Sequence, residues 1–219
     1  MYAFTDKKKT NISKLLFLVG KHKWIALILM LGTYQFSGGL YIFAKAELAQ
    51  YLIAHAWHRN LESAQHHKPW PWADTHPVAE LIINDENWYV LAGASGRNLA
   101  FAPTHVSSTP EPGEKGNSVI VGHRDTQFNS LKRLQKGDLI EVKTKHKRQQ
   151  FKVTMLRIAD YSQLEYLHNN NNNTFDVDQS SLTLITCYPF DSVLPNPIHR
   201  YIVRAIAISS PTVANVRHK

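Results

Sequence analysis

The chain of 219 residues contains one cysteine, Cys187, so no disulfide can form within it. The fold must therefore be held together by a hydrophobic core, even in an oxidising compartment. The length suffices for one well-buried domain with appendages and is too short for two large domains. A lone thiol is a liability in an oxidising compartment unless it is used, which favours a functional Cys187.

Outside its first residues the chain also lacks an excess of positive charge. The formal charge is +8, but residues 1–23 hold six lysines against one aspartate and account for +5 of it. The remaining +3 is an ordinary surface balance, and no recognisable nucleic-acid-binding motif accompanies it. We therefore expect no nucleic-acid partner, and we interpret residues 1–23 as a basic tail.

Residues 24–44 contain no charged side chain. As a helix, this stretch would span about 31 Å, close to the hydrocarbon thickness of a bilayer. The six lysines of the tail precede it, which predicts a single-pass anchor in the inner (cytoplasmic) membrane, with the tail in the cytoplasm and the rest of the chain on the periplasmic or extracytoplasmic side. The alternative is a signal peptide cleaved at Ala44-Lys45-Ala46, although the apolar run exceeds the usual length of such a peptide.

Residues 45–77 combine a helical pattern with a linker rich in proline and tryptophan. Apolar residues recur at three- and four-residue steps between residues 46 and 57, which predicts an amphipathic helix continuing toward Leu61. This helix could pack on the following domain or serve as a stalk near the membrane surface. Prolines at 69 and 71 then stop any helix. His66 and His67 are adjacent and have no further spaced ligand, so we interpret them as solvated linker and predict no metal site.

Helical patterns are scarce after residue 77, and short strands separated by turn-rich stretches take their place. Many strands with few helices indicate an all-β barrel or sandwich over residues 78–208. Two short helices are expected, at Asn129–Gln135 and at Gln163–His168. Gly137 should end the first of them. The five asparagines at 169–173 indicate a loop, and residues 209–219 a tail. The expected strands are Ala79–Ile83, Trp88–Ala92, Ser118–Gly122, Leu139–Lys143, Phe151–Ile158, Leu182–Cys187 and Tyr201–Ile208, with Leu99–Ala102 as the candidate for an eighth.

The only cysteine lies at the end of one of these strands. Alternation along the strand places Thr183, Ile185 and Cys187 on one face. The thiol therefore sits where the strand runs out into a loop, the kind of place where a rigid scaffold holds reactive groups. The alternative is that Cys187 is a buried small hydrophobic residue, as most unpaired cysteines are.

The stretch Thr183-Leu184-Ile185-Thr186-Cys187 resembles the nucleophile signature of the sortases, a family of membrane-anchored cysteine transpeptidases. That family also has a histidine after an earlier strand and an arginine on the strand that follows the cysteine. Both are present here, as His123 at the end of Val119-Ile120-Val121-Gly122 and as Arg200. The resemblance covers about residues 69–208.

Two further stretches, Trp70-Pro71-Trp72-Ala73-Asp74 and Gly122-His123-Arg124-Asp125-Thr126, are similar to the sortases of Gram-negative bacteria of the marine proteobacterial type. The resemblance implies a closed, eight-stranded β-barrel with short helices. It would be preceded by the N-terminal transmembrane helix and an amphipathic helical stalk.

The resemblance also implies the site residues. Cys187 is the expected nucleophile, His123 the acid and base, and Arg200 a donor to the developing oxyanion, while Thr186 and Tyr188 beside the thiol are expected substrate contacts. A thiol attacks as the thiolate, and a neighbouring histidine can take its proton and return it to a leaving amine. A guanidinium supplies a permanent charge and a fork of donors. No cofactor is expected.

Other residues compete for these roles. His105 and His199 are rival histidines, but His199 adjoins Arg200 on a strand, so these two side chains should point to opposite faces. Arg200 could also be an ordinary surface arginine. Asp125 could orient a catalytic group, although a salt bridge with Arg124 or a turn cap explains it equally well, and we leave it out of the catalytic set.

Sortases cleave a protein substrate near its C-terminus at a Leu-Pro-x-Thr-Gly-like signal, hold the acyl fragment as a thioester and pass it to an amine. The resemblance implies that activity here, with an amine or water as acceptor. The chain departs from the best-known members in lacking an obvious calcium-binding carboxylate cluster. One alternative is a peptidoglycan transpeptidase or amidase with a Cys-His pair, although the Ser-His-Gly-Cys motif typical of such transpeptidases is absent. Another is a membrane-tethered binding module with an inert Cys187.

Overall fold

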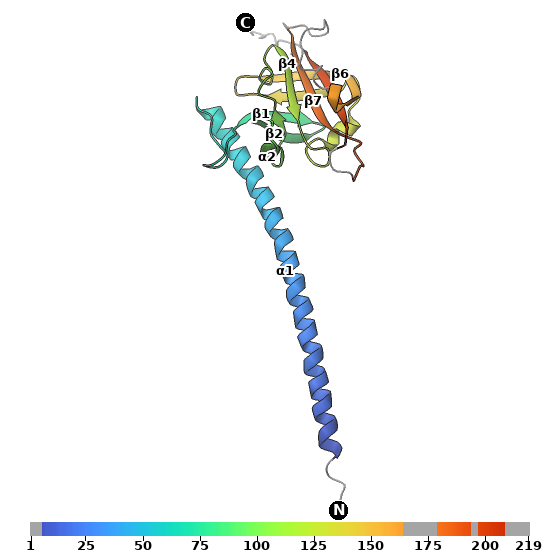
Figure 1. The fold of residues 1–219 in the computed structure, drawn as a ribbon. Helices are drawn as coiled ribbons and strands as arrows, with labels where there is room; N and C mark the ends of the chain where they lie inside the picture. Colours follow the sequence, from blue (N-terminus) through green and yellow to red (C-terminus); the bar gives the residue numbers. More distant parts are fainter. Residues whose placement is uncertain (1–5, 164–178, 194–196, 209–219) are drawn as a thin grey trace, which may run out of the picture. The chain divides into compact units, whose positions relative to one another are not determined.

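The computed structural model describes residues 6–163, 179–193 and 197–208, with side chains described from residue 22 onward (Figure 1). The chain divides into two compact units, Met1–Leu48 and Ala49–Lys219. The asparagine run at 169–173, the expected helix Gln163–His168 beyond its first residue, and the tail at 209–219 lie outside the described residues.

Helix α1 begins at Asp6 and ends at Glu62, so its residues up to Leu48 belong to the first unit and its last residues to the second. Leucine, isoleucine and alanine are frequent along it and no proline interrupts it, so the ladder of α-helical hydrogen bonds continues without a break. From His22 to Leu48 every residue is exposed. By length and composition α1 could cross a membrane, and it is the one helix of the described residues that could.

In the second unit the last residues of α1 pack on a β-barrel. Ile53 lies in an apolar cluster with Leu91 and Ala102, and Asn60 Nδ2 donates a hydrogen bond to the carbonyl of Pro77 at 3.0 Å. Of the two alternatives for the predicted amphipathic helix, the structure therefore shows the one in which the helix packs on the following domain. The buried positions recur at the expected steps: Ala49, Ile53, Ala56, Trp57 and Asn60.

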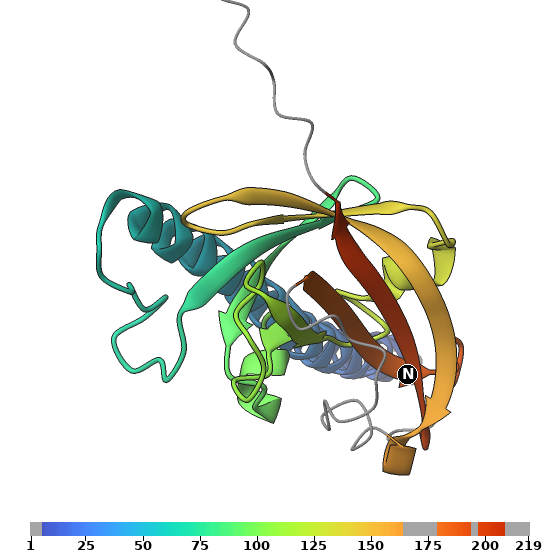
Figure 2. The ribbon, with the colours of Figure 1, turned by 90° about the horizontal axis from the view of Figure 1, so that it is seen from above.

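Eight strands in the described residues close into a barrel, which confirms the expected fold class (Figure 2). Around the barrel their order is β1-β2-β3-β4-β7-β8-β6-β5. The pairs β2/β3 and β4/β7 are parallel, and all other neighbouring pairs are antiparallel. The strands are β1 (Pro77–Ile83), β2 (Glu86–Ala92), β3 (Thr104–His105), β4 (Gly116–Val121), β5 (Leu139–Lys143), β6 (Arg148–Asp160), β7 (Ser180–Tyr188) and β8 (His199–Ile208).

Alternate residues of the strands fill the barrel. In β1 every second residue from Pro77 to Ile83 is buried, as the period of a strand requires. The interior also takes in Phe128 and Leu131 from the segment between β4 and β5, together with Phe151 from β6. Each such fully buried side chain contributes roughly 1.5–3 kcal/mol to folding, so the core stabilises a chain that has no disulfide.

The prediction of a strand at Leu99–Ala102 is wrong. The short helix α2 (Gly96–Leu99) occupies its start, and the N-cap Ser95 accepts a hydrogen bond from the backbone N–H of Asn98 at 3.2 Å. The buried Asn98 side chain donates in turn to the carbonyl of Gly93 at 3.0 Å. These local polar contacts favour a turn over a strand at this place. The eighth strand is instead β3, which has only two residues.

The expected helix Asn129–Gln135 is a 3₁₀-helix, η1, over Asn129–Arg133. It ends at Arg133 with Leu134 as its C-cap, whose backbone is extended, so Gly137 does not end it as expected. Gly137 has a φ of +105° and lies in the next turn, where its N–H donates to the carbonyl of Val153 at 2.8 Å. A second 3₁₀-helix, η2, covers Tyr161–Gln163.

Candidate active site

The strand order β4-β7-β8 makes neighbours of the chain segments that carry or precede the predicted catalytic residues. In the parallel pair, Val121 of β4 lies opposite Ile185 of β7, and the N–H of Gly122 donates to the carbonyl of Ile185 at 3.2 Å. His123 follows Val121 by two residues, as Cys187 follows Ile185. In the antiparallel pair of β7 and β8, Cys187 lies directly opposite Arg200. Chain segments far apart in sequence thus meet at one end of the sheet.

The thiol is on the outer face of the barrel. Ile185, two residues before Cys187, belongs to an apolar cluster with Val119, Ala159 and Ile202, separate from the barrel core. Residues directly opposite each other on antiparallel strands share a face, so Cys187 and Arg200 lie on that same outer face. Cys187 is a free cysteine of intermediate exposure.

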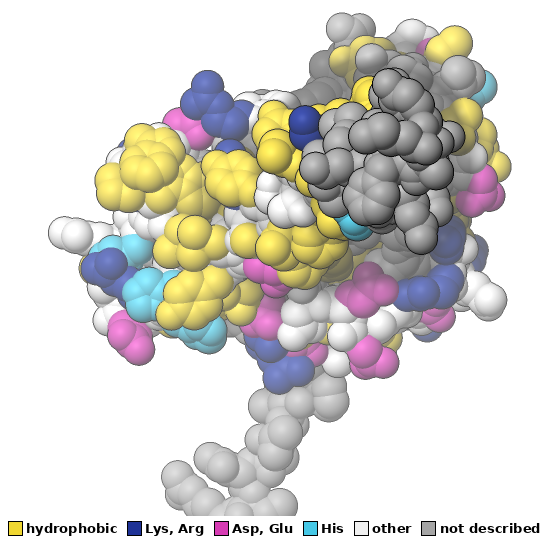
Figure 3. Space-filling view, turned by 90° about the horizontal axis from the view of Figure 1, so that it is seen from below, with side chains coloured by type: hydrophobic (Ala, Val, Ile, Leu, Met, Phe, Trp, Pro, Cys, Tyr) yellow, Lys and Arg dark blue, Asp and Glu magenta, His cyan; other side chains and the backbone are white. Residues whose placement is uncertain are grey.

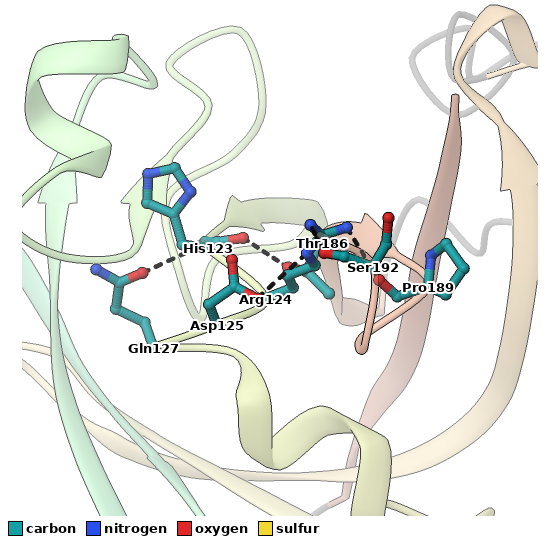
Figure 4. Close-up of polar contacts among 8 residues, drawn as sticks. His123, Arg124, Asp125, Gln127, Thr186, Pro189 and Ser192 are labelled. Carbon is teal, nitrogen blue, oxygen red and sulfur yellow. Dashed lines mark hydrogen bonds and ion pairs between the residues drawn. The ribbon is translucent and has the colours of Figure 1, made fainter. Parts of the chain in front are cut away.

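His123 is held by its backbone, and its side chain is left exposed (Figure 4). Its N–H donates to Gln127 Oε1 at 3.0 Å, and its carbonyl accepts from the N–H of Phe128 at 2.9 Å. The preceding Gly122 is required for packing, because a Cβ there would lie 2.8 Å from the Phe128 ring. The loop after β4 is therefore fixed to the core while the imidazole stays free to meet a substrate.

The two rival histidines lie elsewhere. His105 is buried in β3 opposite Ile120, and its Nε2 lies 2.9 Å from the carbonyl of Pro110. Its ring therefore joins neighbouring backbone segments. His199 is exposed and lies opposite Tyr188, one position from Arg200 and so on the other face of β8.

Arg200 is held at the rim of the site. Its Nη1 donates to the carbonyl of His199 at 3.0 Å and to the carbonyl of Pro197, and its guanidinium carbon lies 5.1 Å from the centre of the Tyr161 ring. The neighbouring Asp160 has its pKa lowered, mainly by hydrogen bonds from the backbone and the side chain of Ser162 and further by the nearby Arg200 charge. The rim therefore combines a fixed cation with an ionised carboxylate.

Arg124 is a functional candidate that the sequence analysis missed. It is 7% exposed, and it joins the His123 loop to the loop after Cys187 (Figure 4). Nη1 donates to the carbonyl of Pro189 at 2.9 Å and Nη2 to the carbonyl of Ser192 at 2.5 Å. Nε lies 3.2 Å from Asp125 Oδ1, which confirms the salt bridge weighed for that aspartate. An arginine in a polar loop carries no sequence signal that distinguishes this role from a solvated surface charge.

Replacing Arg124 with alanine should therefore destabilise the second unit by about 2–3 kcal/mol, because hydrogen bonds from a buried charged group to two carbonyls are lost. Denaturant unfolding of the detergent-solubilised chain measures this. The matched control is Arg97→Ala, which removes an exposed pair with Asp74 at 3.5 Å and should change stability by less than about 1 kcal/mol. Equal effects of the two substitutions would contradict the role given to Arg124.

The predicted substrate contacts Thr186 and Tyr188 point away from the thiol's face. Thr186 is 2% exposed, and its hydroxyl donates to the carbonyl of Gly122 at 2.8 Å. Tyr188 stacks on Tyr201 with ring centres 6.2 Å apart. Because side chains alternate along a strand, both neighbours of Cys187 lie on the opposite face. Thr186 therefore ties the ends of β4 and β7 together, and the structure gives it no surface for a substrate.

Comparison with known proteins places this geometry in a family. Residues 83–208 match the family model of the sortase domain. This match covers more than half of the chain, and the chain therefore belongs to the sortase family.

Among the described residues no group of three or more His, Cys, Asp or Glu side chains could hold a metal ion.

Individual relatives agree with this family. Sortase D of Bacillus subtilis (strain 168) is 28% identical over 114 residues, which cover 52% of this chain and 54% of that protein. The chain thus matches about half the length of this curated relative. The Clostridium perfringens Sortase D5 transpeptidase superposes with a TM-score of 0.50 at 26% identity, over 61% of this chain and 80% of that one. Sortase A from Corynebacterium diphtheriae gives a TM-score of 0.54 at 22% identity, over 64% and 65%, and supports the fold alone.

Proposed function

We propose that the protein is a cysteine transpeptidase that cleaves a C-terminal, Leu-Pro-x-Thr-Gly-like sorting signal and transfers the acyl fragment to an amine. The observation that carries this proposal is the strand register. Cys187 of β7 lies opposite Arg200 of β8, and His123 follows by two residues the end of β4, the other neighbour of β7, which supports a shared site for the three side chains. Each residue then has the chemistry that one step of acyl transfer needs.

The steps follow from the three side chains. His123 takes the proton of Cys187, and the thiolate sulfur forms a bond to the scissile carbonyl carbon. Arg200 donates hydrogen bonds to the oxyanion that develops. The C–N bond then breaks as His123 returns the proton to the leaving amine, which leaves a thioester on Cys187. An incoming amine, or water, loses its proton to His123 and bonds to the carbonyl carbon of the thioester. The C–S bond breaks, and His123 gives that proton to the departing sulfur, which restores the thiol.

Arg200 would have to reorient for its part. Its Nη1 is held by the carbonyls of Pro197 and His199 in this structure, while the register places its backbone beside Cys187. A guanidinium is planar and rigid, so turning it would release at least one of these backbone contacts and free N–H groups for an oxyanion. We propose that a bound substrate selects this orientation.

Turnover of peptides tests the function. A panel of Leu-Pro-x-Thr-Gly-like peptides should be cleaved, and an added amine should appear in the product. Peptidoglycan stem peptides in the same assay should remain intact. Cleavage of the stem peptides alone would instead identify a peptidoglycan transpeptidase or amidase, and no turnover of either set would favour a binding module.

We also propose the finer placement of the chain. The stretches Trp70–Asp74 and Gly122–Thr126 support the Gram-negative, marine proteobacterial subgroup. Residues 24–44 would be the anchor in the inner membrane, residues 1–23 the cytoplasmic tail, residues 45–77 the helix and linker, and residues 78–208 the catalytic barrel. The charge-free helix and the lysines before it support this organisation.

The topology leads to a direct expectation. Protease added to intact spheroplasts should degrade the second unit, because residues 45–219 would lie outside the cytoplasm. An epitope placed after Lys219 would report that loss, and a cytosolic protein in the same cells should survive. Full protection of the epitope until the membrane is permeabilised would refute this orientation.

A further inference from the structure

The 3₁₀-helix η2 lies at the end of β6, beside the start of β8 (Figure 2). The N–H of Tyr161, its first residue, donates to the carbonyl of Ile198 at 3.0 Å, just beyond the last pair of the two strands. The neighbours of Tyr161 are tied together as well, because Asp160 Oδ1 accepts from the N–H of Ser162 at 2.9 Å and from its hydroxyl at 2.8 Å. The backbone of Tyr161 is therefore fixed, while the residue is 63% exposed.

Exposure alone does not distinguish Tyr161 from other aromatic residues. Figure 3 shows many exposed hydrophobic side chains on one face of the molecule, and single exposed side chains of this kind are ordinary. The ring of Tyr161 differs because the guanidinium carbon of Arg200 lies 5.1 Å from its centre, within the range of a cation–π contact. A fixed aromatic residue is thus in contact with the side chain that would donate to the oxyanion.

Arg200 lies between the segment that carries this ring and the strand that carries the thiol. Around the barrel, β8 has β7 on one side and β6 on the other. Cys187 of β7 is directly opposite Arg200, and so is Ala159 of β6, two residues before Tyr161. The ring therefore contacts the guanidinium from the side of β8 that faces away from β7.

The contacts of the guanidinium respond differently when it turns. A hydrogen bond weakens steeply as its angle closes, so the bonds from Nη1 to the carbonyls of Pro197 and His199 fix one orientation. A ring face attracts the whole cation and requires no particular N–H direction. The ring of Tyr161 can therefore keep the charge of Arg200 at the rim while N–H groups turn toward an oxyanion. Without the ring, the long arginine side chain would gain rotamer freedom.

We propose that Tyr161 is a positioning residue, which holds the guanidinium of Arg200 beside the strand of Cys187 while the substrate reacts. The inference rests on the proposed transpeptidase function, because Tyr161 acts through the oxyanion donor of that reaction. The ring performs this task, and the phenolic hydroxyl has no part in it. Tyr161 should therefore affect the rate of the chemical step and leave the binding of the substrate nearly unchanged.

Steady-state kinetics of the full chain with a sorting-signal peptide test this role. Tyr161→Ala should lower kcat at least about threefold with little change in KM, because the cation–π contact is lost. Tyr161→Phe keeps the ring face and should retain most of the wild-type kcat. Tyr51→Ala is the matched control, since Tyr51 is 67% exposed on α1, and its kcat should equal that of the wild type.

A coupling measurement shows whether Tyr161 acts through Arg200. In the Arg200→Ala background, the further substitution Tyr161→Ala should cause no additional loss of kcat/KM. An equal loss in both backgrounds would show that Tyr161 acts independently of Arg200. A loss in Tyr161→Phe as large as in Tyr161→Ala would assign the effect to the hydroxyl, and a rise of kcat in Tyr161→Ala would mean that the ring holds Arg200 away from the reaction. Each of these three results would overturn the positioning role.

The contact itself can be tested without turnover. Phenylglyoxal modifies accessible guanidinium groups, and peptide mapping by mass spectrometry reports the rate of modification at each arginine. The rate at Arg200 should rise at least about twofold in Tyr161→Ala and stay unchanged in Tyr161→Phe, while the rate at the exposed Arg157 stays the same in both. An unchanged rate at Arg200 in Tyr161→Ala would refute the proposal. A rise at Arg200 in a chain that cleaves no peptide would instead overturn the proposed function, and the positioning role with it.

Discussion

Cleavage and transfer should both disappear when Cys187 is replaced by alanine. The thioester cannot form without the sulfur, and the described residues contain no second thiol. The variant should remain folded, because Cys187 lies at the partly exposed end of β7, outside the barrel core. Peptide turnover and denaturant unfolding, measured on the same preparation, separate lost chemistry from lost structure. Turnover at the wild-type rate would remove Cys187 from the mechanism.

Replacing Arg200 with alanine should cost at least about 3 kcal/mol of transition-state stabilisation, a loss of about a hundredfold or more in kcat/KM, by analogy with other oxyanion donors. The thiol stays in place, so a small alkylating probe should still modify Cys187. Arg157→Ala is a matched control, since Arg157 is an exposed arginine on the neighbouring strand β6, opposite Ile202.

That control should keep most of the wild-type activity. A similar loss in Arg157→Ala would mean that the overall positive charge near the site matters and that Arg200 has no specific role. Normal turnover by Arg200→Ala would refute its assignment outright. A lysine at position 200 would restore the charge without the fork of donors, and it should recover only part of the activity.

The strands could largely be predicted from the sequence, but their arrangement could not. Runs such as Leu139–Lys143 alternate clearly and match β5 residue for residue. The two-residue strand β3 is too short to show any period, so its place was wrongly given to Leu99–Ala102. The parallel pairing of β4 with β7 depends on contacts between residues far apart in the chain. The family resemblance supplied what periodicity alone could not.

The final part of α1 illustrates a second limit of prediction from sequence, which concerns the surroundings of a helix. The spacing of Ala49, Ile53 and Ala56 predicts one apolar face, and the structure shows that face buried on the barrel. The same pattern would serve a helix lying on a membrane, because both surroundings accept an apolar stripe. Only the partner of the stripe decides between the two, and the partner residues Leu91 and Ala102 lie in distant segments.

Arg124 and Thr186 illustrate how far the roles of residues in the candidate active site can be predicted from sequence. Both were interpreted from their immediate neighbours, whereas their hydrogen bonds reach across about 65 positions of the chain, to Pro189 and to Gly122. A buried arginine looks in sequence like a solvated one, and a threonine next to a nucleophile looks like a substrate contact. Their actual partners are backbone carbonyls, which no residue pattern reveals.

The central claim, a thioester on Cys187 formed with the help of His123, can be measured directly. The wild-type chain is mixed with each peptide of a Leu-Pro-x-Thr-Gly-like panel, and mass spectrometry follows both the protein and the peptide. At least one peptide should leave an acyl adduct on Cys187, and added hydroxylamine should release it as a hydroxamate. His123→Ala should form no adduct, because the leaving amine lacks its proton donor, although a small alkylating probe should still label the thiol. An adduct in His123→Ala at the wild-type rate would contradict the role of His123, and no adduct from any peptide would contradict the proposed transpeptidase.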